Sequence, residues 1–381
     1  MPINLPCDIS DTAFAFRGFN RTNLGRTAEL LATSAYRAIV KKELERFSAI
    51  CSEYVSDEVD LVNRVEQGAE PGLEFYAESI ALIVAAEVAQ LRLLREIHGI
   101  ETSLAQLSFG YSLGELTALS FGGMFPVEEM IRVPLELAED TLELAQDIQM
   151  GVLFSRGPTI DEINVQRLCL QITSEGNGTI GISAVLSPNT YLLIGQRDTV
   201  QQFKKVMHDL LPQPAHLRIN DNRWPPLHTP IVRQKCISDR ASVTMETHAG
   251  GFTPPSPPVL SLVTGEMSYD DHSARDILRR WVDHPQRLWD VVDESLDLGV
   301  ESLIHVGPEP NVIPATFRRL SDNVREQTRG SSLGSLGMRA VSGMARRPWL
   351  AAMLPARATL LRAPHVKHVI LEDWLLENAP A

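Results

Sequence analysis

A serine stands between two glycines in the pattern Gly-Tyr-Ser-Leu-Gly at residues 110–114. Apolar residues precede this pattern, and a helix-forming run follows it as far as a Gly-Gly pair at 122–123. A serine at a tight turn between a strand and a helix presents its hydroxyl at the tip, and the glycines relieve crowding there. The pattern therefore predicts that Ser112 is a nucleophile. It also predicts that the Leu113 N–H, at the start of the helix, stabilises an oxyanion.

A serine hydroxyl needs a neighbouring base to remove its proton as it attacks, so a histidine must come from elsewhere in the chain. The sequence has ten histidines. His228 is the first candidate because it lies next to prolines, in a segment that we expect to line a cleft between two domains. His305, within an apolar run, and His284, before a proline, are the next candidates.

The segments around the serine pattern alternate between expected strands and helices, which predicts an α/β fold with a mostly parallel, buried sheet of the α/β-hydrolase type. The apolar run at 12–16 is the expected first strand, and residues 104–109 form the strand that leads into the serine turn. Helical periodicity occupies 23–36, 41–55, 73–98 and 127–148.

From residue 151 the pattern changes to strand, helix, strand, strand, helix, ending near residue 211. This order is most of a split β-α-β unit, so we expect a small ferredoxin-like α+β subdomain inserted into the larger one. Residues 300–306 are expected as the last parallel strand. The predicted boundaries are 12–149 for the first part of the large subdomain, 150–223 for the small one, 224–326 for the second part of the large one, and 327–381 for a linker and basic extension.

The composition excludes several classes of protein. The 381 residues are 44% hydrophobic, enough for a packed core, and the net charge of −13 argues against a nucleic-acid partner. The four cysteines lie far apart without a Cys-x-x-Cys pair, so we expect no metal site, no disulfide framework and a reducing, cytoplasmic compartment. No apolar stretch approaches the roughly 20 residues of a membrane-spanning helix.

The end of the sequence differs in charge from the rest. Residues 327–381 hold seven Lys or Arg and three Asp or Glu, and residues 336–361 mix basic and large apolar side chains. Such a segment either docks on an anionic membrane or an acidic partner, such as a carrier protein, or lies along its own acidic body. Pro348 and Pro355 interrupt any long helix and favour the second alternative. Residues 365–376 are expected to form a final strand and short helix.

From residue 12 to about residue 320 the chain resembles the malonyl-CoA:acyl-carrier-protein transacylase family, which includes the acyltransferase domains of polyketide synthases. The resemblance covers an N-terminal strand and loop, the serine turn, a Ser-Pro pair in the small subdomain, a His-containing segment and a late strand and turn. These motifs are residues 14–19, 110–115, 187–188, 227–230 and 301–308.

The resemblance implies that Ser112 accepts the acyl group and that His228 is the general base. It implies an oxyanion hole made by the backbone N–H groups of Leu113 and Phe19, where Phe19 replaces the family's glutamine. Because this hole uses backbone donors, the replacement does not abolish it.

The family supports its histidine with a main-chain carbonyl rather than an acid, here near Arg280 and Trp281. The resemblance further implies that the substrates are thioesters of coenzyme A and of the phosphopantetheine of an acyl carrier protein. Pantetheine belongs to these substrates, so no bound cofactor is expected.

Departures from the family bear on the acyl group. Malonyl-specific members use an arginine to pair the free carboxylate, and a gap-free count from Ser112 places Leu137 at that position; a shift of about one turn would bring in Arg132 instead. Leu186 replaces an asparagine before the Ser-Pro pair, and Tyr111 replaces a histidine. We therefore predict an apolar, monocarboxylic acyl group in a pocket formed by Tyr111, Leu137, Leu186 and Leu227.

Two other functions remain open from the sequence. An acyl-thioester hydrolase on the same scaffold uses the same serine, histidine and oxyanion hole, with water as the acceptor. A family member that binds carrier protein without chemistry is the other alternative. The retained Ser112 and His228 argue against it, whereas Phe19, Tyr111 and Leu137 give it some support.

Overall fold

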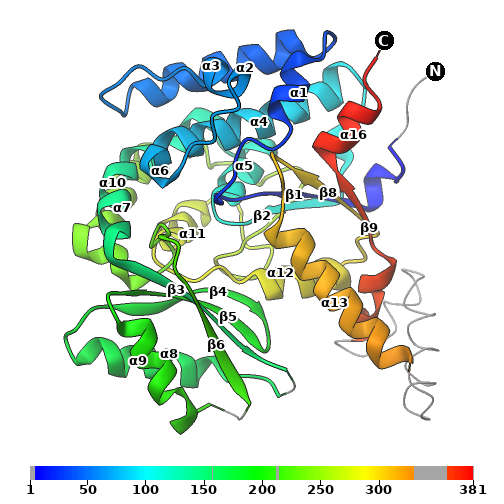
Figure 1. Ribbon diagram of the computed structural model, residues 1–381. Coiled ribbons are helices and arrows are strands. Elements are labelled where there is room, and N and C mark those ends of the chain that lie inside the picture. Colours follow the sequence, from blue (N-terminus) through cyan, green and yellow to red (C-terminus); the bar gives the residue numbers. More distant parts are fainter. Residues whose placement is uncertain (1–4, 157, 212–213, 330–357, 381) are drawn as a thin grey trace.

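The structure is a computed structural model, and it describes residues 5–156, 158–211, 214–329 and 358–380 (Figure 1). A five-stranded sheet in the order β7-β2-β1-β8-β9 forms the centre of the larger subdomain, and all its pairings are parallel. The predicted α/β fold with a parallel sheet is confirmed. The strands are β1 Thr12–Phe16, β2 Leu107–Gly110, β7 Val259–Leu260, β8 Ser302–Val306 and β9 Lys367–Ile370.

The central strands are short and buried along their whole length, because helices cover both faces of the sheet. Figure 1 shows α1, α2, α4 and α16 on one side of it, with α12 and α13 on the other. The helices of this subdomain are α1 Thr27–Ala32, α2 Arg37–Ser52, α3 Leu61–Glu66, α4 Tyr76–Glu96, α5 Leu113–Phe121, α6 Val127–Glu136, α7 Ala138–Leu144, α10 Ile237–Glu246, α11 Ala274–Trp281, α12 Leu288–Asp297, α13 Val312–Arg329 and α16 Leu371–Glu377.

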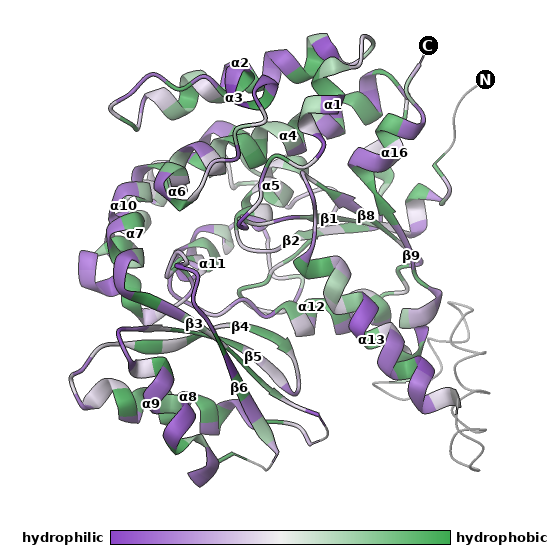
Figure 2. Ribbon diagram, in the orientation of Figure 1, coloured by the Kyte–Doolittle hydropathy of each residue, from purple (hydrophilic) through white to green (hydrophobic). Residues whose placement is uncertain are grey.

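The outer helices are amphipathic, as α13 illustrates. Its Ile313 and Phe317 are buried against the core beneath the sheet, while polar residues alternate with them around the helix (Figure 2). Short 3-10 turns connect several elements, at Ile9–Asp11, Leu73–Phe75, Thr102–Leu104, Ala145–Asp147, Met207–Asp209, Pro230–Lys235 and Ala358–His365.

A second, antiparallel sheet has the order β4-β5-β3-β6, and α8 and α9 cover its outer face (Figure 1). This order, with the sequence β-α-β-β-α-β, is the ferredoxin-like arrangement expected from the sequence. Its elements are β3 Ile148–Ser155, α8 Glu162–Ser174, β4 Ile180–Ser187, β5 Thr190–Gln196, α9 Thr199–Val206 and β6 Ala215–Asn220.

Two features of residues 127–220 differ from the prediction. The helix expected over 127–148 is two helices, α6 and α7, because Leu137 leaves the helical conformation between them. Ile148, the last residue of the expected helix, is instead the first residue of β3. The strand β6 was not predicted at all. It pairs antiparallel with β3 and completes the sheet.

The strand expected at 300–306 is β8, but it is not the last strand of the sheet. The strand β9 pairs parallel with it, with Ser302 opposite Lys367, and α16 follows at once. The carboxylate of Glu372 accepts hydrogen bonds from the backbone N–H groups of Arg26 at 2.9 Å and Glu309 at 2.8 Å. The C-terminal strand and short helix are therefore part of the large subdomain. Most of the basic segment at 336–361 lies outside the described residues.

Among the helices of the described part of the chain, none combines the length and apolar character needed to cross a lipid bilayer.

The C-terminal helix supplies a test of this packing. The side chain of Leu375 is fully buried, so Leu375→Ala should lower the free energy of unfolding by about 2–5 kcal/mol, through lost burial and the cavity left behind. Urea denaturation measures the change. Leu170→Ala, at a residue that is 71% exposed on α8, is the matched control and should change it little. Equal midpoints for Leu375→Ala and the wild type would contradict the packing of α16.

Candidate active site

Ser112 lies in the turn between β2 and α5, with φ of 54° and ψ of −117°. A non-glycine residue with positive φ is strained, and such strain is common at nucleophile turns. The flanking glycines are required by close backbone approaches: a Cβ at Gly110 would overlap the backbone of Gly114, and one at Gly114 would lie 2.5 Å from the Phe16 carbonyl oxygen. The sheet and the helix thus hold the serine in its strained conformation.

The histidine predicted from the sequence faces this serine. The Nε2 of His228 is 2.7 Å from the Ser112 Oγ, and its Nδ1 is 2.6 Å from the carbonyl oxygen of Trp281. Because a carbonyl oxygen only accepts, Nδ1 carries the proton and donates it to Trp281. The Nε2 lone pair is then free to accept the hydrogen of the serine hydroxyl.

The environment of His228 favours its neutral form. The residue is only 4% exposed, and burial lowers its pKa to about 4, although the hydrogen bond to the Trp281 carbonyl acts in the opposite direction. Near neutral pH the ring is therefore a base ready to accept a proton.

The segment 281–286, between α11 and α12, contacts both residues of this pair. The Trp281 indole N–H donates to the Ser112 carbonyl at 3.1 Å, and the Val282 carbonyl accepts from the His228 backbone N–H at 2.7 Å. The side-chain Oε1 of Gln286 accepts from the Ser112 backbone N–H at 2.9 Å. Gln286 was not predicted from the sequence, because a lone glutamine after a proline carries no motif.

Glu115, one turn into α5, braces the serine turn from behind. Its Oε1 accepts from the Ser261 hydroxyl at 2.7 Å, the Leu262 N–H at 3.1 Å and the Tyr269 hydroxyl at 2.7 Å. The residue is fully buried, and burial raises its pKa to about 7 despite these donors. This network fixes α5 to the segment that follows β7.

The oxyanion hole predicted from the sequence uses the backbone N–H groups of Leu113 and Phe19. Leu113 is the first residue of α5, so its N–H has no acceptor within the helix. Phe19 follows Gly18, where a Cβ would lie 2.5 Å from the Tyr111 carbonyl oxygen and 3.2 Å from the Ser112 Cβ. The loop after β1 therefore passes directly against the serine turn.

The residues predicted to form the acyl pocket fall into two apolar clusters. Leu137 and Leu227 belong to the same buried cluster as Leu113. Tyr111 belongs to a second cluster, and Leu186 packs against it. Burial raises the pKa of the Tyr111 hydroxyl.

Arg132, the alternative to Leu137, is engaged elsewhere. Its guanidinium donates to Glu136 at 2.8 Å and to the Thr247 hydroxyl at 3.3 Å. The two lesser histidine candidates also have other partners: His284 contacts Asp283 at 2.6 Å, and the buried His305 contacts His368 at 2.9 Å.

Two cavities are each lined by one residue that the sequence predicted for the site, Phe19 or Leu186, and by neither Ser112 nor His228. One, of about 520 Å³, lies beside the Phe19 ring, which packs edge-on against Tyr76 and Trp224. The other, of about 900 Å³, separates the β4–β5 hairpin of the small subdomain from α13 and is lined by Leu186, Arg319 and other residues. Both volumes are in the range of small-molecule sites.

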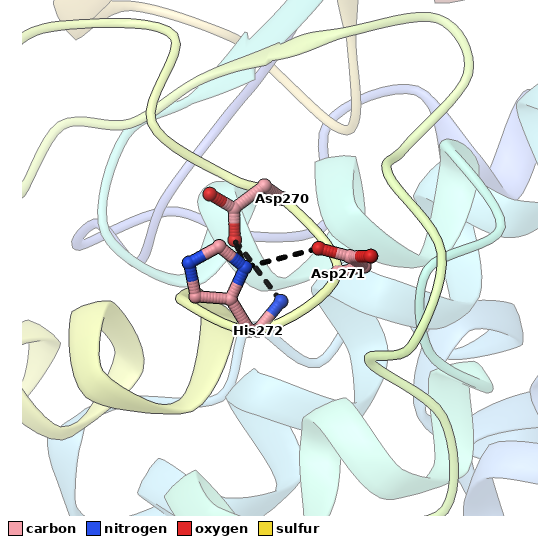
Figure 3. A group of neighbouring side chains, drawn as sticks. All are labelled: Asp270, Asp271 and His272. Carbon is pink, nitrogen blue, oxygen red and sulfur yellow. Dashed lines mark hydrogen bonds and ion pairs between the residues drawn. The ribbon is translucent and has the colours of Figure 1, made fainter.

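Three polar side chains gather on the surface before α11, as Figure 3 shows: Asp270, Asp271 and His272. The Asp270 carboxylate accepts from the backbone N–H groups of His272 at 3.0 Å and Ser273 at 2.7 Å. The His272 side chain is 81% exposed. Hydrogen bonding at the start of a helix accounts for this cluster, and we assign no ligand to it.

A serine turn on a parallel sheet, facing a histidine beside an inserted subdomain, places the chain in the class of α/β proteins with a strand–serine–helix turn. Comparisons with known proteins narrow this class. The malonyl CoA-acyl carrier protein transacylase of Bacillus subtilis is 22% identical over 218 residues, 56% of this chain and 51% of that protein. The chain thus spans about half the length of this curated relative. No family model matches the chain.

Solved structures match over a larger share of the chain. FabD from Acinetobacter baumannii has a TM-score of 0.65 at 20% identity, over 82% of this chain and 91% of that one. A malonyl-transacylase in complex with its type II polyketide synthase acyl-carrier protein has a TM-score of 0.58 at 22% identity, over 81% and 92%. The chain therefore has the fold of the malonyl-CoA:acyl-carrier-protein transacylases and resembles them in sequence, as the motifs predict.

The pKa of His228 leads to a pH prediction. The rate at which a fluorophosphonate probe labels Ser112 should stay constant as the pH is lowered past 6.5. It should fall only as the pH approaches about 4, where the His228 ring becomes protonated. Mass spectrometry of the intact protein measures the rate, with circular dichroism as the control for unfolding. A midpoint near the ordinary value of 6.5 would contradict the effect of burial.

The same pKa contributes to stability. Between pH 6.5 and about pH 4, His228 is protonated in the unfolded state but neutral in the folded state. Its contribution to the free energy of unfolding is therefore complete above pH 6.5 and is lost as the pH falls through 4.

Proposed function

We propose that the protein is an acyltransferase that carries an acyl group on Ser112 between coenzyme A and an acyl carrier protein. The observation that carries this proposal is the chain of short contacts from the Ser112 hydroxyl through His228 to the Trp281 carbonyl. The likeness to transacylases, one of them in complex with an acyl-carrier protein, supports the choice of substrates and partner.

In the first half-reaction, the Ser112 Oγ attacks the thioester carbonyl carbon while His228 Nε2 takes the hydroxyl proton. The N–H groups of Leu113 and Phe19 stabilise the oxyanion of the tetrahedral intermediate. The C–S bond then breaks, and the departing sulfur receives the proton from His228. This leaves an ester on Ser112 and a free pantetheine thiol.

In the second half-reaction, another pantetheine thiol gives its proton to His228 and attacks the ester carbonyl. The bond between the acyl carbon and the Ser112 Oγ then breaks, and His228 returns the proton to this oxygen, which restores Ser112. The imidazolium formed in each half is stabilised through its Nδ1–H by the Trp281 carbonyl, without a carboxylate. The 900 Å³ groove next to Leu186 offers space for a pantetheine arm, and its lining includes Arg156, Arg319 and Glu326.

For the acyl group, we propose an apolar monocarboxylic chain. Leu137 is buried in an apolar cluster, and Arg132 is paired with Glu136, so neither offers a cation to a free carboxylate. A carboxylate left unpaired in a closed pocket would cost several kcal/mol.

The acyl-enzyme supplies the test of the reaction. Brief mixing with an acyl-CoA donor should add one acyl mass to the wild-type protein and none to Ser112→Ala, as measured by intact-mass spectrometry. His228→Ala should slow adduct formation by roughly 10²- to 10⁴-fold, the usual contribution of a general base. Glu115→Gln, behind the turn, is a control that retains both reacting groups. No adduct from any donor and no thioester hydrolysis would favour a binding protein without chemistry.

The acyl group is tested with a panel of malonyl-, methylmalonyl-, acetyl- and medium-chain acyl-CoA donors. We expect adducts from the monocarboxylic donors and little from the two dicarboxylic ones, because neither Leu137 nor Arg132 offers a cation to their second carboxylate. An adduct formed from malonyl-CoA alone would refute the assignment from Leu137. Release of free acid faster than transfer to an acceptor thiol would indicate a hydrolase.

A further inference from the structure

Gln286 occupies an unusual position between the two reacting residues. It is fully buried, and its Oε1 accepts the Ser112 backbone N–H at 2.9 Å. Its Nε2 lies 3.3 Å from the Nδ1 of His228. One amide therefore contacts both the backbone of the serine and the ring of the histidine.

The orientation of this amide is fixed by its neighbours. The Ser112 N–H is a donor, so the amide oxygen and not the NH₂ group must face it. The His228 Nδ1–H is already donated to the Trp281 carbonyl at 2.6 Å, so the amide NH₂ beside it acts as a dipole rather than as a hydrogen-bond donor. The positive end of this dipole lies against the ring and disfavours its protonated form.

The backbone of Gln286 joins the site to the small subdomain. Its N–H donates to the Ser183 carbonyl at 2.8 Å, and its carbonyl accepts from Val185 at 2.9 Å, as an isolated parallel bridge to β4. A displacement of β4 relative to the large subdomain would therefore move the amide that holds the serine.

We propose that Gln286 is a positioning residue, which holds the strained Ser112 backbone for attack and adds to the effect of burial in keeping His228 neutral. This inference rests on the proposed roles of Ser112 and His228. It assigns to an uncharged side chain a function that neither the serine motif nor the histidine motif contains.

Two substitutions separate the parts of this role. Gln286→Met keeps the length of the side chain but removes the acceptor for the Ser112 N–H, and should slow fluorophosphonate labelling of Ser112 roughly 10- to 100-fold. Gln286→Glu keeps an acceptor and places a carboxyl group beside the ring. It should raise the pKa of His228 and move the acid limb of the labelling rate upward by roughly one pH unit or more.

The matched control is Gln196→Met. Gln196 is 8% exposed on β5, and its amide accepts from the Thr179 N–H at 3.2 Å and donates to Gln234 at 3.1 Å. Substitution of a glutamine that has only a structural role should lower the melting temperature. It should change neither the labelling rate at pH 8 nor the pH at which this rate falls in acid. Wild-type labelling by Gln286→Met together with an unmoved acid limb in Gln286→Glu would overturn the proposal.

A second measurement makes the test independent of reactivity. NMR titration of the His228 imidazole nitrogens should show a higher pKa in Gln286→Glu than in the wild type, whether or not Ser112 reacts. If the probe does not label the wild type but the NMR shift is present, the proposed function fails and the placement of Gln286 stands. If the probe labels the wild type but neither the NMR shift nor a rate change is found, the inference about Gln286 fails. Should Gln286→Met not fold, Gln286→Glu decides the question alone.

Discussion

The hydrogen bond from His228 Nδ1 to the Trp281 carbonyl is the interaction on which the arrangement of the site depends. It selects the tautomer whose Nε2 faces Ser112, and it does so without placing a second charge in a buried site, where an ion would be costly. The carbonyl belongs to a segment that also contacts the backbone of both reacting residues. A shift of this one segment would therefore displace Ser112 and His228 together.

The remainder of the large subdomain holds that segment and the serine turn in fixed positions relative to each other. The carboxylate of Glu115 ties the helix after the serine to the segment after β7, where the Leu262 carbonyl accepts from Arg287, the residue after Gln286. Leu262 thus links the two parts of the site. Its N–H donates to Glu115 on the helix after the serine, and its carbonyl accepts from Arg287, next to Gln286. Strain at Ser112 is tolerated because this surrounding network determines its conformation.

The features that were predictable from sequence are those with a local signature. The serine turn is a contiguous pattern, the central strands are short apolar runs, and the order of elements after Gly151 is distinctive. Gln286 was not predictable, because its role arises from contacts with residues far away in the chain. The strand β6 was missed because only Ala215 and Leu217 of its residues are well buried, and half-exposed strands carry a weaker apolar signal. The pairing of Arg132 with Glu136 also required the structure.

The position of β9 has a consequence for synthesis of the protein. This strand completes the sheet beside β8 and is separated from it in sequence by α13 and the residues that follow. On the ribosome, β8 emerges with its outer row of N–H and C=O groups unpaired until residues 367–370 have also emerged. An open parallel edge is a site for wrong pairing between chains. The order of the elements thus leaves the outer edge of β8 without its native partner until α13 and β9 have both been translated.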